Sequence, residues 1–172
     1  MNAADRAKLP PAKVARDGPR LTGAKLEERL AVTWSNPPGF IGWLSSVDHK
    51  DIGRRYVITA LAFLALAGAL AIVMRLQLSK PDNDLIGAAR YNEIFTMHGT
   101  TMMFLFAVPV MQGMQIYLTP LMLGTRANAF PRLNAFSYFT YVFAGIFLWT
   151  AFVLNIAPDV GWFAYTPLTG PE

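Results

Sequence analysis

Three long uncharged segments dominate the pattern of apolar and polar positions along the chain. Asp, Glu, Lys and Arg are absent from residues 56–74, 94–125 and 134–157. An α-helix rises about 1.5 Å per residue, so about 20 apolar residues cross the hydrocarbon core of a bilayer. The pattern therefore predicts an all-α membrane protein with three transmembrane helices, which we place at residues 56–78, 91–123 and 134–157.

Polar and turn-forming segments separate these helices. Residues 1–36 are basic and are interrupted by prolines, which predicts a flexible arm. Residues 37–55 combine a short apolar stretch, expected at the membrane interface, with a charged collar before the first helix. Residues 158–172 are rich in Pro and Gly and form a segment on the outer face. Pro109 lies inside the second helix and predicts a kink near its middle.

Lysine and arginine are unevenly distributed between the two ends of the predicted helices. The basic residues on the side of the N-terminus are Lys50, Arg54, Arg55, Arg126 and Arg132. The opposite side carries Lys80 and Arg90, and the segment after the third helix has no basic residue. Because cytoplasmic loops carry the excess of basic residues, we expect the N-terminus to lie in the cytoplasm and the helices to cross a bacterial inner membrane.

The composition agrees with a membrane protein and excludes several other classes. Hydrophobic residues make up 53% of the chain and charged residues only 15%. Cysteine is absent, which excludes disulfides and thiolate metal sites. The formal net charge of +4 is small and is concentrated near the N-terminus. We therefore expect contact with membrane lipid and no binding of nucleic acid.

His98 is the candidate functional residue because it stands alone inside the uncharged second helix. An ionisable side chain in a membrane is costly and needs a partner. Three partners fit the sequence: a metal, as in haem ligation, a polar group of a neighbouring helix, or a proton carrier. The topology places His98 one to two turns below the outer face, near Arg75 and Trp162. A haem could use all three side chains, and Gly99 would leave room for its flat macrocycle.

Four motifs extend this interpretation to a family. They are DHKDIG at residues 48–53, Tyr91-Asn92 followed by Thr96-Met97-His98, AFPRLN at residues 129–134, and Gly161-Trp162 with Tyr165 and Pro167-Leu168. In their order and spacing, over about residues 40–170, they closely resemble subunit I of the haem–copper oxidases, the cytochrome c oxidase family. Any one motif is weak, but four in register are very specific. The resemblance does not extend to the basic arm before Pro37.

The resemblance implies a role for each candidate site residue. His98 matches an axial ligand of the six-coordinate, low-spin haem, which takes electrons from a copper-bearing partner subunit. Arg75 matches the arginine that bonds the formyl group of haem a, and Trp162 matches a tryptophan near the haem propionates. Without the resemblance, Arg75 is interpreted as a snorkelling cation and Trp162 as an interfacial anchor. Tyr91 and Tyr165 are further candidates for the haem surroundings.

Three positions concern the proton-uptake channel of proton-pumping family members. Ala127 replaces an aspartate at the cytoplasmic mouth of the channel, and Ile116 replaces an asparagine that lines it. A second channel asparagine is retained as Asn134. A methyl group cannot collect a proton, and an isoleucine blocks a water chain that an asparagine would support. We therefore expect an oxidase in which pumping is absent, reduced or routed elsewhere.

The ligands of an oxygen-reducing centre are incomplete in this chain, which has only two histidines. His49 lies in the cytoplasmic collar and is interpreted as structural. The resemblance implies a second haem and copper in the full subunit, neither ligated by this stretch. We therefore interpret the chain as the first part of a twelve-helix subunit I bundle. The implied partners are the remainder of subunit I, a copper-bearing subunit II, subunit III and cytochrome c.

Three functions are compatible with the sequence. The first is part of a respiratory terminal oxidase, an oxidoreductase that oxidises cytochrome c and reduces oxygen to water. The second is a quinol oxidase of the same superfamily, whose partner subunit would lack copper ligands. The third is a membrane scaffold that retains the helices but binds no haem.

Overall fold

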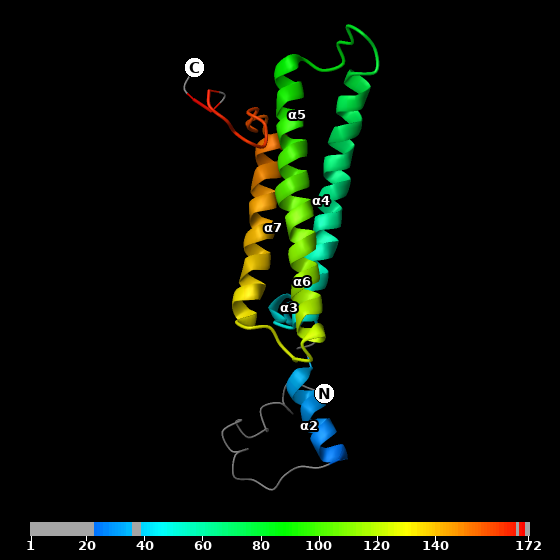
Figure 1. The fold of residues 1–172 in the computed structure, drawn as a ribbon, viewed down its shortest axis with the longest axis vertical. Coiled ribbons are helices and arrows are strands. Elements are labelled where there is room, and N and C mark those ends of the chain that lie inside the picture. The colour runs from blue at the N-terminus through cyan, green and yellow to red at the C-terminus, as the bar shows by residue number, and fades with distance from the viewer. Residues whose placement is uncertain (1–22, 36–38, 168, 171–172) are drawn as a thin grey trace.

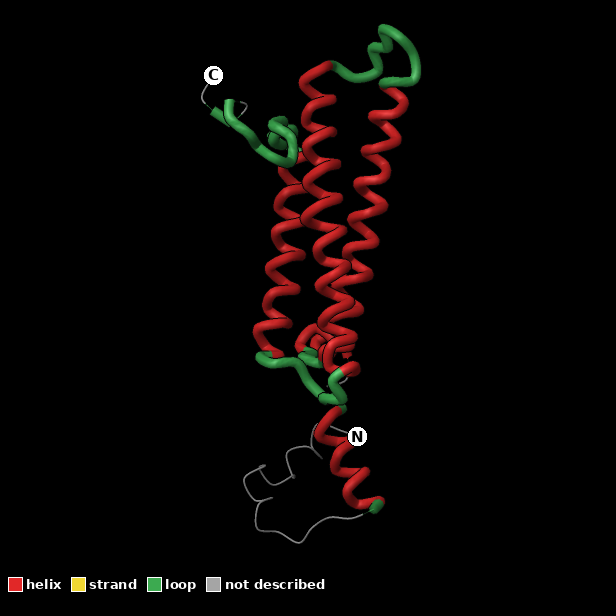
Figure 2. The backbone as a smooth tube through the Cα atoms, viewed as in Figure 1, coloured by secondary structure: helices red, strands yellow, loops and turns green. Residues whose placement is uncertain are grey.

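A computed structural model describes residues 23–35, 39–167 and 169–170 of the chain. All regular structure in these ranges is helical, without a strand. The elements are α2 (Ala24–Trp34), α3 (Gly39–Ser45), α4 (His49–Gln77), α5 (Ala88–Thr100), the π-helix η2 (Thr101–Ala107), α6 (Val108–Met122) and α7 (Pro131–Val153). Figure 1 shows their arrangement, and Figure 2 separates the helices from the connecting loops.

Three long helical rods stand side by side and form the bundle (Figure 1). The rods are α4, the continuous run of α5, η2 and α6, and α7. Each is long and apolar enough to cross a membrane, and these are the three such helices in the described part of the chain. The predicted all-α membrane fold with three spanning helices is therefore confirmed for these residues.

The first rod begins earlier than the prediction of residue 56, because its start is set by a cap. The carboxylate of Asp48 accepts a hydrogen bond from the backbone N–H of Lys50 at 2.9 Å, the geometry of a helix N-cap. Helix α4 therefore begins at His49. The charged collar is not a separate segment but the first turns of this helix.

The ends of the other rods also differ from the predicted ones by a few residues. Helix α5 begins at Ala88 instead of residue 91, and α6 ends at Met122. Helix α7 begins at Pro131 instead of residue 134 and ends at Val153 instead of residue 157. Proline suits the first turn of a helix, where its missing N–H leaves no bond unmade. Hydropathy located the spans, whereas caps and prolines set their limits.

Part of the basic arm is helical. Residues Ala24–Trp34 form the helix α2, which projects below the bundle in Figure 1. The sequence there contains no proline and many good helix formers, such as Ala, Leu, Glu and Lys. Residues 1–22 and 36–38 lie outside the described residues.

The second rod contains the π-helix η2 immediately before Pro109. Proline has no N–H, so the carbonyl of Leu105, four residues earlier, lacks its α-helical donor. The Tyr141 hydroxyl on α7 donates to this carbonyl at 2.7 Å. The backbone N–H of Val108 reaches back to the Met103 carbonyl, the five-residue spacing of a π-helix. The predicted effect of Pro109 thus takes the form of a π-segment and a bond between two rods.

Small residues allow the rods to approach closely. A Cβ atom added at Gly53 on α4 would lie 2.7 Å from the Gly113 carbonyl oxygen on α6. At the other end, α4 and α5 share a cluster of buried residues: Leu70, Met74, Ile94 and Met97. The glycine crossing and this cluster hold α4 against the second rod at two levels. They fix the register in which His98 meets α4.

Candidate functional site

The ring of His98 in α5 is oriented by a main-chain carbonyl of α4. Its Nδ1 lies 2.9 Å from the Ala67 oxygen. A carbonyl can only accept, so Nδ1 carries the proton and donates it, which leaves the lone pair of the neutral ring on Nε2. Among the described residues Nε2 has no hydrogen-bond partner, and the side chain is partly exposed. This is the usual arrangement of a metal-ligating histidine, whose second ring nitrogen is held by a carbonyl or carboxylate.

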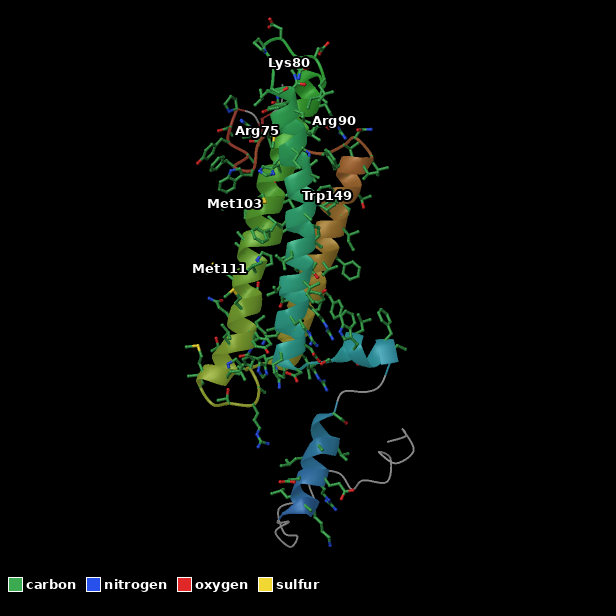
Figure 3. The ribbon with its side chains drawn as sticks, turned by 90° about the vertical axis from the view of Figure 1, so that its right-hand side faces the viewer. Arg75, Lys80, Arg90, Met103, Met111 and Trp149 are labelled. Carbon is green, nitrogen blue, oxygen red and sulfur yellow. The ribbon has the colours of Figure 1, made fainter. Side chains whose placement is uncertain are left out.

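One face of α4 next to Ala67 is not covered by other described residues at Gly68 and Arg75, and we call it the open strip. Gly68 and Arg75 are two turns apart and share one helix face. A Cβ atom added at Gly68 would meet no atom within 4 Å. Arg75 is exposed, and within the described ranges its guanidinium has no ion pair or hydrogen bond. Figure 3 shows Arg75 near the end of the bundle that carries Lys80.

His98 lies deeper in the bundle than predicted. Because α5 begins at Ala88, His98 is about 15 Å, nearly three turns, from the start of its helix. The prediction of one to two turns assumed a later start. Arg75 lies about 12 Å beyond Ala67 along α4. The imidazole and the guanidinium therefore lie on adjacent helices at different depths.

Trp162, in the segment that follows α7, packs on the backbone of Gly99, the residue after His98. A Cβ atom added at Gly99 would lie 3.0 Å from Cδ1 of Trp162, so the indole covers the backbone of Gly99. The ring of Phe104 meets the indole edge-on, with 6.2 Å between centroids. The structure thus places Trp162 against the helix that carries His98, one residue along from it. The prediction that Gly99 leaves room for a macrocycle is wrong because the indole takes that space.

Thr96 is a further polar residue of this region, and its role could not be predicted from the sequence. Its hydroxyl donates to the Asn92 carbonyl at 2.8 Å and accepts from the Gly161 N–H at 2.9 Å. The side chain is only 1% exposed. A threonine that bonds its own helix backbone is common, so the only signal in the sequence is its place in the Thr96-Met97-His98 motif. The second bond exists only because the fold brings Gly161 to α5.

The two tyrosine candidates lie around the site. Tyr91 is partly buried and packs against the core cluster shared by α4 and α5. Tyr165 is 69% exposed and stacks on Phe163, with 5.4 Å between ring centroids. Neither phenol makes a hydrogen bond within the described residues. Their predicted roles rest on position alone.

The positions related to the proton channel gather at the opposite end of the bundle. Ile116 is 8% exposed and packs in a core cluster with Ile52, Tyr56 and Tyr138. Ala127 is exposed in the loop between α6 and α7. The side-chain amide of Asn134 donates to the Ala129 carbonyl at 3.3 Å. A hydrocarbon side chain therefore fills the position where the resemblance expects a polar one.

His49 also lies at this end, at the start of α4. It is 5% exposed, and its Nδ1 is 3.4 Å from the Asp48 carboxylate. Within the described part of the chain, no group of three or more His, Cys, Asp or Glu side chains could hold a metal ion. The site around His98 can therefore supply one imidazole to a metal but no complete ligand set.

Comparison with known proteins identifies the family. A family model described as cytochrome c and quinol oxidase polypeptide I matches residues 51–172. The chain belongs to this family. The resemblance of the motifs to subunit I is therefore confirmed, and the three rods are spanning helices of a subunit I sequence.

Individual relatives agree with the family model. The chain is 39% identical over 145 residues to the probable cytochrome c oxidase subunit 1-alpha of Streptomyces avermitilis, covering 83% of this chain and 25% of the relative. It is 40% identical over 141 residues to cytochrome c oxidase subunit 1 of Bacillus subtilis, covering 81% and 23%. It is 44% identical over 128 residues to the heme-copper oxidase subunit I+III of Aeropyrum pernix, covering 74% and 16%. The chain thus spans a quarter or less of these relatives.

Proposed function

We propose that this chain contributes to the catalytic subunit of a respiratory terminal oxidase, and that Nε2 of His98 is an axial ligand of its low-spin haem. The observation that carries the proposal is the bond from Nδ1 to the Ala67 carbonyl, which fixes the tautomer with a free Nε2 lone pair. Bound there, the haem, expected as haem a, supplies one-electron transfer. The described residues hold no second imidazole near His98 that could complete a ligand set, since His49 lies at the other end of α4.

The surroundings of His98 fit a large flat cofactor on the α4 side. Gly68 leaves the helix surface open next to the residue that holds the imidazole. Arg75 on the same face has donors available for a polar substituent such as a formyl oxygen. Trp162 closes the site on the side of Gly99. The residues that would hold the haem are therefore His98 and Arg75, with Trp162, and more distantly Tyr91 and Tyr165, around them.

A spectroscopic comparison tests the ligand. In the intact oxidase, His98→Ala is expected to abolish the low-spin band in a reduced-minus-oxidised spectrum, because no other described imidazole can reach that position. His49→Ala is the matched control and should retain the band, since His49 lies at the other end of α4. An unchanged band in His98→Ala would refute the assignment and favour a polar helix contact, a proton relay or a scaffold without haem.

The electron donor in our proposal is cytochrome c, and the acceptor is oxygen, reduced to water. Several relatives carry the name cytochrome c oxidase subunit 1, although the family model also includes quinol oxidases. We propose a copper-bearing subunit II and subunit III as partners, beside the remainder of subunit I; one relative is named as a subunit I+III. Oxygen uptake with reduced cytochrome c, compared with a quinol, separates the two oxidase classes.

The proposed oxidase does not use the family's usual proton-uptake route. Ile116 packs against buried hydrocarbon and aromatic side chains, and Ala127 cannot exchange a proton. Proton-to-electron stoichiometry in vesicles should be low, or insensitive to blocking this route. The double substitution Ile116→Asn with Ala127→Asp is expected to raise it, whereas Ala129→Asp in the same loop is the control. Full pumping by the unmodified enzyme that is lost on blocking the route would contradict the proposal.

A further inference from the structure

The hydroxyl of Thr96 links two segments that are far apart in the sequence. It donates to Asn92 within α5 and accepts the backbone N–H of Gly161, 65 residues later. A single hydroxyl can do both because it carries one proton and two lone pairs. The Thr96 side chain is only 1% exposed, so water has little access to its hydroxyl. Removing the Thr96 hydroxyl would therefore take this acceptor away from the Gly161 N–H.

This link fixes where Trp162 lies. Gly161 has a φ of +73°, a left-handed conformation that suits glycine and turns the chain. The next residue, Trp162, then lays its indole on the backbone of Gly99, at the contact of 3.0 Å that an added Cβ would make. Thr96 and Gly99 lie about one turn apart on α5. One helix turn thus holds both the anchor of the segment and the surface on which the indole rests.

We propose that Thr96 is a positioning residue that acts through Trp162 and holds the indole as a cover on Gly99, the residue after His98. The inference rests on the proposed haem ligation by His98. A low-spin haem that is shielded from water has a higher reduction potential, because water stabilises the more charged oxidised form. Thr96 therefore sets the electron affinity of the site without touching the cofactor.

Hydrogen exchange of the intact oxidase tests the link without any reference to haem. Thr96→Val keeps the side-chain shape and removes the hydroxyl. It should speed exchange of the Gly161 amide about tenfold, which corresponds to a lost bond of about 1.4 kcal/mol. Thr101→Val is the matched control, because the Thr101 hydroxyl is equally buried but has no partner, and it should leave this amide unchanged. Thr96→Ser should restore slow exchange. Unchanged exchange in Thr96→Val overturns the link.

The midpoint potential of the low-spin haem tests the positioning role. Thr96→Val should retain the haem band and lower its potential, and Thr96→Ser should restore it. In a Trp162→Ala background, Thr96→Val should have no further effect, since the residue through which it acts is gone. Additive shifts, or faster exchange with an unchanged potential, overturn the positioning role while leaving haem ligation intact. Failure of the ligand assignment would instead appear as a haem band retained in His98→Ala.

Discussion

At the scale of single residues, the site depends on a partner that local sequence does not reveal. The Ala67 carbonyl that orients His98 lies 31 residues earlier, on another helix. The isolated imidazole and its neighbour Trp162 could be predicted, because charge pattern and topology bring them together. The tautomer, the Thr96 link and the covered backbone of Gly99 could not, since each depends on the rotation and register of packed helices.

Gly68 offers a residue-scale test of the space beside His98. Gly68→Leu should fold normally, because a Cβ there meets no atom within 4 Å. The branched side chain would fill the open strip of α4, so we expect most of the low-spin haem to be lost. Haem content per protein, measured with the thermal midpoint of the purified oxidase, separates loss of cofactor from loss of fold.

Gly87→Leu is the control for this substitution. Gly87 also has open space around its added Cβ but lies in the loop before α5, away from the imidazole. It should retain both haem and stability. Full haem content in Gly68→Leu would show that the cofactor does not lie on this face of α4.

At the scale of elements, hydropathy is enough to find the rods but not to describe them. The three spans can be found because each contains a long stretch without Asp, Glu, Lys or Arg. The Asp48 cap and Pro131 set the starts of α4 and α7. Each is a single residue, and a hydropathy average over about 20 residues does not detect it. The π-helix η2 could not be predicted, because Pro109 permits a kink, a bulge or a gap. The choice depends on a donor from α7, the Tyr141 hydroxyl.

Removing that donor should weaken the contact between the second and third rods. In Tyr141→Phe the Leu105 carbonyl loses its only non-helical donor in the described residues, and Pro109 cannot supply an N–H. A buried carbonyl without a partner costs about 1–3 kcal/mol. We expect a lower free energy of unfolding, measured by denaturant titration of the purified oxidase in detergent.

A double-mutant cycle identifies the cause. Pro109→Ala restores a backbone N–H at that position, which can serve the Leu105 carbonyl in an α-helical register. Tyr141→Phe should therefore cost less in the Pro109→Ala background than in the unmodified chain. Equal costs in both backgrounds would mean that the tyrosine stabilises the bundle only through its packing.

At the scale of the whole molecule, the three rods expose many large apolar side chains whose contact with water is unfavourable. Phe143 and Phe147 on α7 are 69% and 80% exposed, and Ile72 on α4 is 63% exposed. Surfaces of this kind face lipid or further helices. The chain covers 25% or less of these three relatives, and we propose that further helices of a subunit I cover part of this surface. The hydropathy of the sequence cannot show which of these side chains face lipid and which face other helices, because side chains of both kinds are apolar.

The orientation of the bundle can be tested with single cysteines, because the chain has none of its own. We propose that the loop between α4 and α5 faces outward and the loop between α6 and α7 faces the cytoplasm, according to the distribution of basic residues. Lys80→Cys should react with a membrane-impermeant maleimide in intact cells. Arg126→Cys should react only after the membrane is opened. Both positions are exposed in their loops, so a difference in labelling reports the side of the membrane.

The pairing of the two variants makes the outcome unambiguous. Each replaces one basic residue, so the change in net charge is the same for both. Lys80→Cys increases the excess of basic residues on the cytoplasmic side, whereas Arg126→Cys lowers it by one. Equal labelling after permeabilisation shows that both cysteines are accessible to the reagent. The reverse order in intact cells would place the N-terminus and Ile116 outside. It would also bring Arg75 and Trp162 to the cytoplasmic side, where a haem edge could not receive electrons from an external cytochrome c.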